Sequence, residues 1–446
     1  MDLFACGSRV CFFLRVRSIF SLSLIVIASA GILRAQSNVQ VISTPTADLG
    51  AAIAGACSAA GPNGQVKVNV PGGTLSTAPF ATCAAATVIE FGPGDFTFTG
   101  AAAANTIAVN GIKIRGAGKG ATVFDLDSAT SDFFTVTGKY FELSGMHIRP
   151  AQGVKRTSGN LVVAHAALGL VHDVLLVDPF NGFLLEGPTT GGWTFNNISI
   201  ETSGGNWNYL FKTYSASGTS TSFSIHNVSG SLTNAVEQGP LMIFDSRTDT
   251  VSLTDINIVG AGGQPIVRCQ DTDKAGVGQW PRWVHFENSF LESPHSTVID
   301  LQNSRDFSYQ NGYLSNANVG IAIGPGAFDT KIIGNALPNL AQQGITIAAG
   351  SKASTIKGNT FDSDGMSGAG VPIVDVAANA SNFSIEGNQA YSFYGQANWP
   401  NYGVRIATGK STRFLVVNND FQQTKLGAVH NGATTGTVYT VSGNMP

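Results

Sequence analysis

Residues 331–361 read KIIGNALPNLAQQGITIAAGSKASTIKGNTF, and this stretch contains one complete unit of a repeat. The unit is an apolar-x-apolar triplet, a short polar turn, a second strand of alternating polarity, and then an Asn followed by another apolar strand. The Asn stands at Asn335 and returns at Asn359, 24 residues later. Alternation with a period of two residues indicates β-strands, so each unit is expected to hold two or three short strands.

The same Asn or Asp recurs from the middle of the sequence to its last residues. It stands at Asp173, Asn197, Asn227, Asp255, Asn288, Asn311, Asn335, Asn359, Asn388, Asn419 and Asn444. The steps are 24, 30, 28, 33, 23, 24, 24, 29, 31 and 25 residues, about 27 on average. Asn can adopt the left-handed conformation at a tight corner, and its amide can bond to the same amide one coil away. We therefore expect these residues to form a single file along a stack of coils.

This period predicts an all-β fold, a single-stranded right-handed parallel β-helix with coils of roughly 22–33 residues. One coil cannot bury its apolar face alone, whereas stacked coils bury a column of Ile, Val, Leu and Phe between parallel strands about 4.8 Å apart. The alternative, a β-propeller, needs blades of ~40–45 residues, and no WD or kelch signature is present. A solenoid has no internal linker, so residues 37–446 are expected to form a single domain, with N-terminal coils at 64–130 and repeat coils at 131–446.

Composition agrees with this fold class. Gly contributes 53 of 446 residues, charged residues are only 12%, and hydrophobic residues are 43%. A chain this apolar is not expected to be disordered, and one this poor in Lys, Glu and Arg is not a coiled coil. There is no Gly-X-Y period, which excludes collagen.

The ends of such a stack need a cover, because an open end exposes core and unpaired backbone. The Ala-rich segment 47–60, ADLGAAIAGACSAA, is expected to form a short capping helix that begins at Asp48. The segment 64–75 is expected to be strand and turn. Cys57 and Cys83 lie 26 residues apart, and a disulfide between them would tie the helix to the first strands. The alternative is a pair of buried thiols.

Residues 1–36 have the pattern of a secretory signal peptide, with a positively charged start, an apolar run from Ser18 to Leu33, and small residues before Gln36. The apolar run is shorter than the ~20 residues that a membrane span needs, so a signal is favoured over an uncleaved anchor. The mature chain is expected to be extracellular or periplasmic, with no membrane span. It keeps 21 basic and 27 acidic residues, a formal net charge of −6. No Lys/Arg cluster exists, so nucleic acid is not an expected partner.

Three further features carry a resemblance to a known group. They are the strand and PGG turn at Val66–Gly73, the phrase IKIRGAGKGATVFDL at 112–126, and the later IxGN corners. With the capping helix they resemble the pectate-lyase-like β-helix superfamily, which includes polygalacturonase-like enzymes and phage tailspike depolymerases. The resemblance spans residues 45–446. It implies a protein that acts on a polysaccharide or oligosaccharide, and the tailspikes allow a homotrimer. The polygalacturonase signatures NTD, GHG and RIK are absent, so the resemblance specifies the fold more than the reaction.

In this fold the inward side chains are core, so chemistry must come from outward side chains and from the longer turns. Aligning the apolar triplets gives one outward ionisable residue in each of five consecutive coils. These residues are Glu186, Lys212, Asp245, Arg268 and Asp300. They are expected to stand in one line, with neighbours about 5 Å apart and alternate coils about 10 Å apart.

The functional interpretation of this line is a substrate groove, with Asp245, Arg268, Asp300 and Glu186 catalytic and Lys212 binding substrate. Carboxylates one coil apart suit inverting glycoside hydrolysis, which needs a separation of ~6.5–9.5 Å. A lyase would instead use carboxylates to hold Ca²⁺ against a uronate while a basic group abstracts a proton. Ca²⁺ is therefore expected only if the protein is a lyase, and no other cofactor is indicated. The alternative is a self-neutralising ladder that only stabilises the stack.

The longest step contains RCQDTDKAGVGQWPRW at 268–283. Its candidate substrate-binding residues are Asp271, Asp273, Trp280, Arg282 and Trp283. Two Trp residues and several charges suit the wall of a sugar-binding groove, and a packed surface loop is the alternative. The DTD triplet resembles half of a Ca²⁺ loop but lacks the Gly and Glu that should follow it, so the metal-binding signal is weak.

The leading hypothesis is a secreted carbohydrate-active β-helix protein that binds and cleaves a polysaccharide in a groove on its outer face, as a hydrolase or a lyase. The alternative is a non-catalytic extracellular surface, adhesion or carbohydrate-binding protein. The seven His residues accompany no Ser or Cys nucleophile motif and are expected to be structural. The stretch GAGKG at 116–120 lacks the strand–helix setting of a phosphate loop, so nucleotide binding is not expected.

Overall fold

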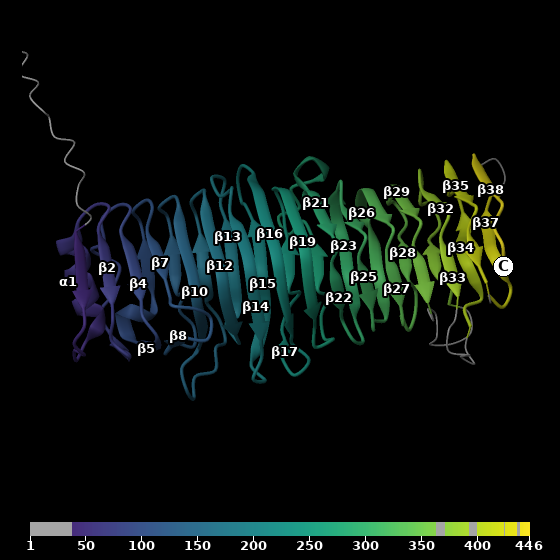
Figure 1. Cartoon of the computed structure of the whole chain (residues 1–446). Coiled ribbons are helices and arrows are strands. Elements are labelled where there is room, and N and C mark those ends of the chain that lie inside the picture. The colour runs from purple at the N-terminus through teal and green to yellow at the C-terminus, as the bar shows by residue number, and fades with distance from the viewer. Residues whose placement is uncertain (1–37, 363–370, 392–398, 423, 435–437) are drawn as a thin grey trace, which may run out of the picture. The chain divides into compact units, whose positions relative to one another are not determined.

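The computed structural model describes residues 38–362, 371–391, 399–422, 424–434 and 438–446. The expected signal peptide at 1–36 lies outside these residues. Within them the chain winds into a β-solenoid of about 14 turns whose coils stack one on the next (Figure 1). The strands of neighbouring coils pair in parallel. The parallel β-helix expected from the repeat is confirmed.

Each coil contributes strands to three parallel sheets, which we name A, B and C. Sheet A contains β1 (Val39–Ile42), β2 (Gln65–Val68), β4 (Val88–Phe91), β7 (Lys113–Arg115), β21 (Arg282–Glu287), β24 (Ser308–Gln310), β29 (Lys352–Lys357), β32 (Ser384–Glu386), β35 (Phe414–Val417) and β38 (Tyr439–Ser442). Sheet B contains β3 (Gly72–Leu75), β5 (Gly94–Phe98), β8 (Thr122–Leu126), β22 (Phe290–Glu292), β25 (Tyr313–Ser315), β27 (Ala336–Pro338), β30 (Thr360–Asp362), β33 (Gln389–Tyr391) and β36 (Asp420–Phe421).

Sheet C contains β6 (Asn105–Ile107), β9 (Phe134–Val136), β11 (Asn160–Ala164), β13 (Phe180–Glu186), β15 (Asn206–Tyr214), β17 (Val236–Glu237), β18 (Met242–Phe244), β20 (Val267–Cys269), β23 (Thr297–Arg305), β28 (Ile345–Ile347), β31 (Val374–Val376), β34 (Tyr402–Gly409) and β37 (Gly427–Ala433). Seven strands bend at a corner and belong to two sheets. Those from A to B are β10 (Phe141–Pro150), β12 (Gly169–Val177), β14 (Thr194–Glu201), β16 (Ser220–Ser231) and β19 (Thr248–Val259), and those from C to A are β23, whose Arg305 pairs with β21, and β26 (Val319–Ile333).

The recurring Asn and Asp residues form two files, so the single expected file is wrong. The first six, from Asp173 to Asn311, occupy the A–B corner in the left-handed conformation, with φ between 50° and 57°. In the later coils the corner residue is one position earlier and is usually Gly, as at Gly334 with φ 69°. Because Gly adopts this conformation without steric cost, the following Asn is free to turn its amide inward.

The inward file is a ladder of buried amides. Its members are Asn335, Asn359, Asn388, Asn419 and Asn444. In each of the first four, Nδ2 donates to the Oδ1 of the Asn in the next coil, at 2.9 Å from Asn335 to Asn359 and 3.0 Å from Asn359 to Asn388. The amide-to-amide hydrogen bonding expected from the sequence is confirmed for these coils.

Inward side chains of all three sheets form one continuous apolar core. In the N-terminal coils it is rich in Phe, with ring centroids of Phe91 and Phe124 4.9 Å apart and those of Phe98 and Phe133 also 4.9 Å apart. Trp193 and Trp207 are completely buried in the middle of the stack. Burial of these rings supplies much of the hydrophobic stabilisation of the coils.

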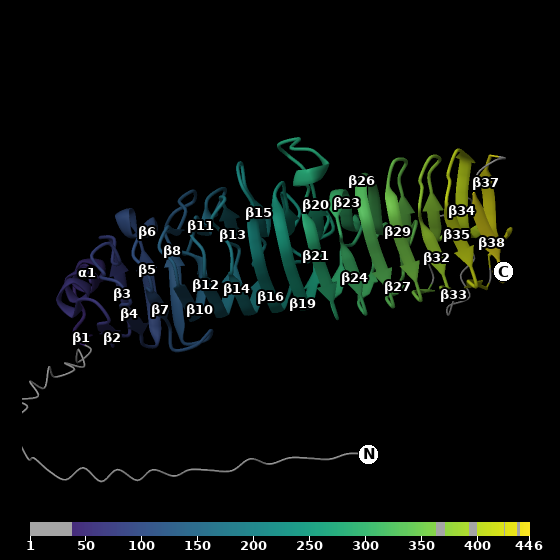
Figure 2. The ribbon, with the colours of Figure 1, turned by 90° about the horizontal axis from the view of Figure 1, so that it is seen from above.

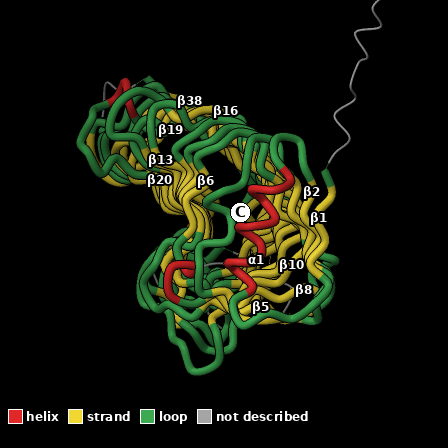
Figure 3. Tube along the Cα trace, turned by 90° about the vertical axis from the view of Figure 1, so that its left-hand side faces the viewer, coloured by secondary structure: helices red, strands yellow, loops and turns green. Residues whose placement is uncertain are grey.

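The first coil is covered by α1 (Leu49–Ala60), which lies across the end of the stack in Figure 3. The carboxylate of Asp48 accepts hydrogen bonds from the backbone N–H groups of Gly50 and Ala51, as expected for an N-cap. The disulfide Cys57–Cys83 is present and joins α1 to the segment before β4. The capping helix and the disulfide expected from the sequence are both confirmed.

The segment between β20 and β21 projects from the stack and includes the short helix η2 (Val277–Gln279) (Figure 2). A second short helix, η1 (Gly100–Ala103), connects β5 to β6. Cys269 at the end of β20 is a buried free thiol. Among the described residues no helix is long and apolar enough to cross a bilayer.

Candidate functional site

Outward side chains of three neighbouring coils gather on sheet A beside the corner with sheet B. The outward position nearest the corner is occupied in successive coils by Arg115, Ser144 and His172. The outward position two residues earlier is occupied by Lys113, Glu142 and Leu170. The parallel register therefore brings a His, a carboxylate and two cations together from β7, β10 and β12.

The surface is hollowed at this place because the corner residues have no side chain. A Cβ on Gly145 would lie 2.6 Å from the carbonyl oxygen of Gly116, and a Cβ on Gly116 would lie 2.2 Å from that of Gly145. Only two glycines permit this approach of the backbones. The resulting open groove has a volume of about 750 Å³ and is bordered by the segment 116–119.

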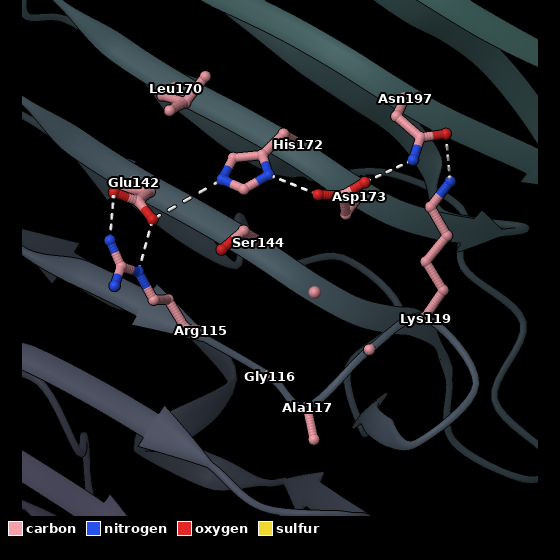
Figure 4. Close-up of a pocket in the computed structure, with 12 residues that line it drawn as sticks. Arg115, Gly116, Ala117, Lys119, Glu142, Ser144, Leu170, His172, Asp173 and Asn197 are labelled. Carbon is pink, nitrogen blue, oxygen red and sulfur yellow. Dashed lines mark hydrogen bonds and ion pairs between the residues drawn. The ribbon is translucent and has the colours of Figure 1, made fainter.

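His172 lies between two carboxylates in this groove (Figure 4). Its Nδ1 is 2.7 Å from Oδ2 of Asp173, and its Nε2 is 3.7 Å from Oε1 of Glu142. Arg115 binds the other side of Glu142 through Nε, 2.6 Å from Oε1, and through a terminal nitrogen 3.1 Å from Oε2. The Glu142 carboxylate is nearly buried, whereas the His172 side chain is 30% exposed.

Lys119 completes a continuous chain of polar contacts along the groove (Figure 4). It reaches from the segment after β7 to β14, where its Nζ is 3.0 Å from Oδ1 of Asn197 and 2.9 Å from Oγ of Ser199. The Nδ2 of Asn197 donates in turn to Oδ1 of Asp173. The chain therefore runs from Lys119 through Asn197, Asp173, His172 and Glu142 to Arg115.

The surroundings of these groups shift their proton affinities. Burial by itself raises the pKa of Glu142, but the hydrogen bonds and charge of Arg115 outweigh it and hold that pKa below its ordinary value. Hydrogen bonds from His172 and Asn197 lower the pKa of Asp173. Burial lowers the pKa of Lys119, although the charge of Asp173 opposes this. Both carboxylates are therefore ionised at neutral pH, and Lys119 releases its proton more readily than an exposed lysine.

This arrangement fixes what His172 can do. An ionised carboxylate only accepts hydrogen bonds, so Nδ1 carries the proton that is shared with Asp173. The neutral ring then presents the lone pair of Nε2 to the groove, because Glu142 lies beyond hydrogen-bond distance. If the ring takes up a second proton, both neighbouring carboxylates stabilise the imidazolium. Proton abstraction from a bound ligand is the chemistry that this geometry allows.

The five residues of the expected outward line lie in two files, and the single line is wrong. Lys212 and Arg268 stand in one file, with Ile243 between them, and Asp300 follows Arg268. Glu186 is paired with Tyr214, two residues beyond Lys212, and Asp245 likewise lies two residues beyond Ile243. A slip of two residues keeps every inward side chain inward, so the apolar pattern could not reveal it.

Arg268 and Asp300 form an ion pair, with Nε 2.9 Å from Oδ2. Asp245 is in a different position, since it is only 1% exposed. Its oxygens accept hydrogen bonds from the backbone N–H and hydroxyl of Thr272 and from the amide of Gln270. The carboxylate thus anchors the beginning of the projecting segment and is nearly inaccessible, so its geometry does not support the catalytic role expected from the sequence.

The acidic residues of the projecting segment are also engaged in its own structure. Asp271 accepts hydrogen bonds from Oγ of Ser246 and from Nε1 of Trp280, at 2.7 and 3.1 Å. Asp273 accepts from the hydroxyl of Tyr214 and from Arg247, both at 2.8 Å. These contacts hold the segment against the neighbouring coils.

The aromatic end of this segment remains accessible. Trp283 is 43% exposed, and the guanidinium of Arg282 lies 4.8 Å from its ring centroid. Arg282 also forms an ion pair with Asp249, at 2.6 Å. Of the residues expected to wall a groove, Trp283 is therefore the one whose ring is most open to a ligand.

His172 was expected to be structural, and the sequence pattern does not single out the groove. The adjacent ionisable pair His172–Asp173 is visible in VHDVLL, and Lys119 is visible in GAGKG. Lys119 is joined to Asp173 through Asn197 of β14, three coils after β7, and the sequence does not show that these coils are bridged. In the part of the chain that the structure describes, no group of three or more His, Cys, Asp or Glu side chains is arranged to hold a metal ion.

The fold and the groove define this chain as a parallel β-helix with a polar site on the outer surface of its N-terminal coils. No protein-family model matches the sequence, and a comparison with curated proteins found no match. Solved structures do resemble it. The A-module of the mannuronan C-5 epimerase AlgE6 of Azotobacter vinelandii is 13% identical with a TM-score of 0.47, and the match covers 91% of this chain and 96% of that one.

Two further structures are similar to the same extent. The DFA-IIIase of Arthrobacter chlorophenolicus A6, without its lid and in complex with GF2, is 13% identical with a TM-score of 0.48, and the match covers 90% of this chain and all 100% of that one. A mannuronic acid-specific polysaccharide family 6 lyase from human gut microbiota is 11% identical with a TM-score of 0.46, covering 81% and 86% of the two chains. Each likeness is one of chain path at low identity, and none says what this chain binds.

Proposed function

We propose that this protein is a carbohydrate-active β-helix that binds a polysaccharide in the groove beside His172 and cleaves it. The observation that carries the proposal is the position of His172, whose Nδ1 is fixed by Asp173 while Nε2 faces an open groove. An elongated ligand fits such a site because the groove crosses neighbouring coils on the outside of the stack.

His172 and Lys119 would divide the proton transfers of cleavage. In hydrolysis Nε2 takes a proton from water as the water oxygen bonds to the anomeric carbon and the glycosidic C–O bond breaks. In β-elimination Nε2 takes the proton next to a uronate carboxylate, a C=C bond forms, and the C–O bond at the neighbouring carbon breaks. In both reactions the leaving oxygen needs one proton, and Lys119 supports this role because burial lowers its pKa.

The proposed location of the protein is outside the cytoplasm. The disulfide Cys57–Cys83 supports this because such bonds persist in oxidising compartments. The signal-like sequence at 1–36 points the same way. Secretion would also bring the protein to its polysaccharide.

The test is incubation with a panel of acidic and neutral polysaccharides, measuring new reducing ends and the ultraviolet absorbance of unsaturated uronates. Reducing ends alone indicate a hydrolase, and both signals together indicate a lyase. The variant His172→Gln is expected to lose the activity. His285→Gln is the matched control, because His285 lies on the same sheet farther along the stack, where its Nδ1 contacts Oγ of Ser308. Equal activity of His172→Gln and the wild type would contradict the proposal.

A second candidate function, non-catalytic carbohydrate binding, is favoured by one observation. Arginine–carboxylate pairs between neighbouring coils recur around the stack, as at Arg149–Asp125, Arg268–Asp300 and Arg405–Asp375. Such pairs suit a stabilising ladder, with Trp283 as an exposed sugar-stacking ring. Binding of polysaccharides without any cleavage across the panel, weakened by Trp283→Ala and unchanged in His172→Gln, would establish this function instead.

A further inference from the structure

A second pocket lies on sheet B, away from the groove beside His172. It has a volume of about 570 Å³ and lies between the segment 150–156 and the turn at 203–206. The segment follows β10 and carries Lys155 and Arg156, while β10 itself contributes His147 and Arg149 to the wall. The pocket is larger than a single small ion, so it has room for a sugar-sized molecule.

One wall of this pocket contains a buried arginine. Arg156 is 2% exposed, and its guanidinium donates to the carbonyl oxygens of Pro179, Ser128 and Ser131 at 2.7–2.9 Å. Within the described ranges no carboxylate forms an ion pair with it. Burial lowers the pKa of Arg156 to about 10, although Asp132 opposes this. Carbonyl dipoles satisfy the donors, but the positive charge lacks an anion in contact, which is costly in a buried site.

The acidic group of the lining is already saturated. Asp178 accepts hydrogen bonds from hydroxyls of Thr202 and Ser203, at 2.6 and 2.5 Å, from the backbone N–H of Ser203 and from Nε1 of Trp207. Asp125, beside the pocket, is occupied by Nε of Arg149 at 2.7 Å. Asp178 therefore has no oxygen edge free to accept from a ligand, and Oδ1 of Asp125 is engaged by Arg149.

The unused groups of the lining are donors and cations. Lys155 is exposed and forms no hydrogen bond or ion pair with any described residue. The terminal nitrogens of Arg149 form no hydrogen bond within the same residues. The Nε2 atom of His147 is buried at the wall and lacks a partner among the described residues. A buried polar atom without a protein partner is rare in a folded protein, so Nε2 of His147 is available to a ligand in the pocket.

From these contacts we propose that the pocket between 150–156 and 203–206 binds a sugar that carries an anionic substituent, a sulfate, phosphate or carboxylate. Lys155 and Arg149 pair with the anion at the mouth of the pocket, and the buried charge of Arg156 adds to the attraction from behind the wall. A small turn of the His147 ring brings Nε2 to a hydroxyl or oxyanion of the ligand. The site does not depend on cleavage in the groove beside His172.

The test is isothermal titration calorimetry of the full chain with glucose 6-sulfate, glucose 6-phosphate, glucuronate and neutral glucose. The wild type is expected to bind at least one charged sugar at least tenfold more tightly than glucose, and the affinity should fall as salt is raised. The three charged probes distinguish sulfate, phosphate and carboxylate. Histidine NMR provides a second readout, since a bound anion should raise the pKa of His147, which burial and Arg149 lower in the free protein.

Lys155→Gln and His147→Gln should each weaken binding of the charged sugar at least tenfold. Lys155 is exposed, so its substitution leaves the fold intact and keeps the test valid if His147→Gln unfolds. Lys139→Gln, at another exposed lysine, is the matched control and should bind like the wild type. Equal affinity for glucose and the charged sugars, or unchanged affinity in Lys155→Gln, would overturn the proposal. Binding that persists in His172→Gln would show that the pocket is independent of the groove. Binding in a protein that cleaves no polysaccharide would leave this pocket established while refuting the cleavage site.

Discussion

At the residue scale, the described histidines of sheet A differ in what holds their rings. Nδ1 of His172 contacts the carboxylate of Asp173, whereas Nδ1 of His226 contacts the hydroxyl of Thr254 and that of His285 contacts the hydroxyl of Ser308. A carboxylate stabilises the imidazolium that forms when a base takes up a proton, and a hydroxyl gives far less stabilisation. This contrast singles out His172 as the candidate base.

Asp173→Asn tests this role with little change in the backbone. Asn tolerates the left-handed conformation that Asp173 adopts at the corner, with φ 55°. The amide no longer fixes the proton on Nδ1, so the rate of polysaccharide cleavage should fall by about 10²–10⁴-fold. Steady-state kcat measures this. The control is Asn288→Asp, which makes the opposite substitution at a corner residue of a distant coil, with φ 51°. It should leave kcat unaltered. A loss of less than about threefold in Asp173→Asn would argue against the base assignment.

Asp306 and Asp329 are two neighbouring carboxyl groups whose contribution to stability depends on pH. Both are corner residues on neighbouring coils, with φ 54° and 56°. Burial raises the pKa of Asp306, and the adjacent Asp329 raises it further. A raised pKa favours the protonated form in the folded state, so this contribution to stability is greatest below the unfolded value of about 3.9 and is lost as pH rises through the folded value.

Asp329→Asn should therefore stabilise the protein near neutral pH, by a few tenths to about 1 kcal/mol, because it removes a like charge. At pH 3 the difference should vanish. Thermal unfolding at the two pH values measures it, with Asp362→Asn as a control for the loss of one carboxylate elsewhere. If Asp329→Asn is less stable than the wild type at pH 7, a favourable interaction of the Asp329 carboxylate outweighs its repulsion of Asp306.

At the scale of the element, the A–B corner combines two solutions to the same steric problem. In the middle coils Asn or Asp supplies the left-handed residue and stays near the surface, while later coils use Gly and place Asn inside. The inward amide of Asn359 accepts from the backbone and side chain of Asn335 and donates to the carbonyl oxygen of Ile332 and to Asn388. It is only 1% exposed, so each of these partners depends on it.

Asn359→Ala should consequently destabilise the C-terminal coils by roughly 2–5 kcal/mol, since several buried polar groups lose their partner. Urea denaturation followed by circular dichroism measures the effect, and hydrogen exchange locates it. Asn288→Gly is the matched control, because Asn288 is exposed at the corner and Gly adopts the same conformation. If Asn359→Ala and this control have comparable stability, the ladder of amides contributes little to the free energy of unfolding.

At the scale of the whole molecule, the N-terminal cover depends on one carboxylate. Asp48 caps α1 and also binds Ser76 and Thr77 in the turn after β3, with Oδ2 2.6 Å from the hydroxyl of Thr77. Burial alone would raise the pKa of Asp48, but hydrogen bonds from Thr77 and Ser76 outweigh it and lower that pKa. The cap therefore joins the helix to the first coil through a group whose ionised form is favoured by folding.

The sign of this shift gives a prediction for acid. A lowered pKa contributes stability above the unfolded value of about 3.9, and this contribution is lost as pH falls through the folded value. Asp48→Asn keeps a capping side chain but does not titrate, so amide protection of α1 should be about 1 kcal/mol weaker than in the wild type at pH 7, and this difference should narrow steadily as pH falls below about 3.9. Hydrogen exchange of α1 measures this. A difference that stays constant with pH would exclude the carboxylate as the cause.

The stack as a whole could be predicted because its period repeats in every coil, and errors at single positions average out. Asp48 and the Cys57–Cys83 pair were predictable because each follows a local rule of helix capping or spacing. The register of Glu186 and Asp245 was not, because strands slip by two residues without exposing the core. The contact of Lys119 with Asn197 joins residues 78 positions apart, and no local pattern encodes it.

The inward amides all point the same way, each NH₂ toward the oxygen of the following coil. A segment from one such Asn to the next therefore presents an amide oxygen at its N-terminal end and an amide NH₂ at its C-terminal end. Whole segments of this kind can be duplicated or excised while every NH₂ still meets an oxygen. Removal of only part of a coil leaves one donor or acceptor without its partner, which makes the whole coil the natural unit for lengthening or shortening this protein by recombination.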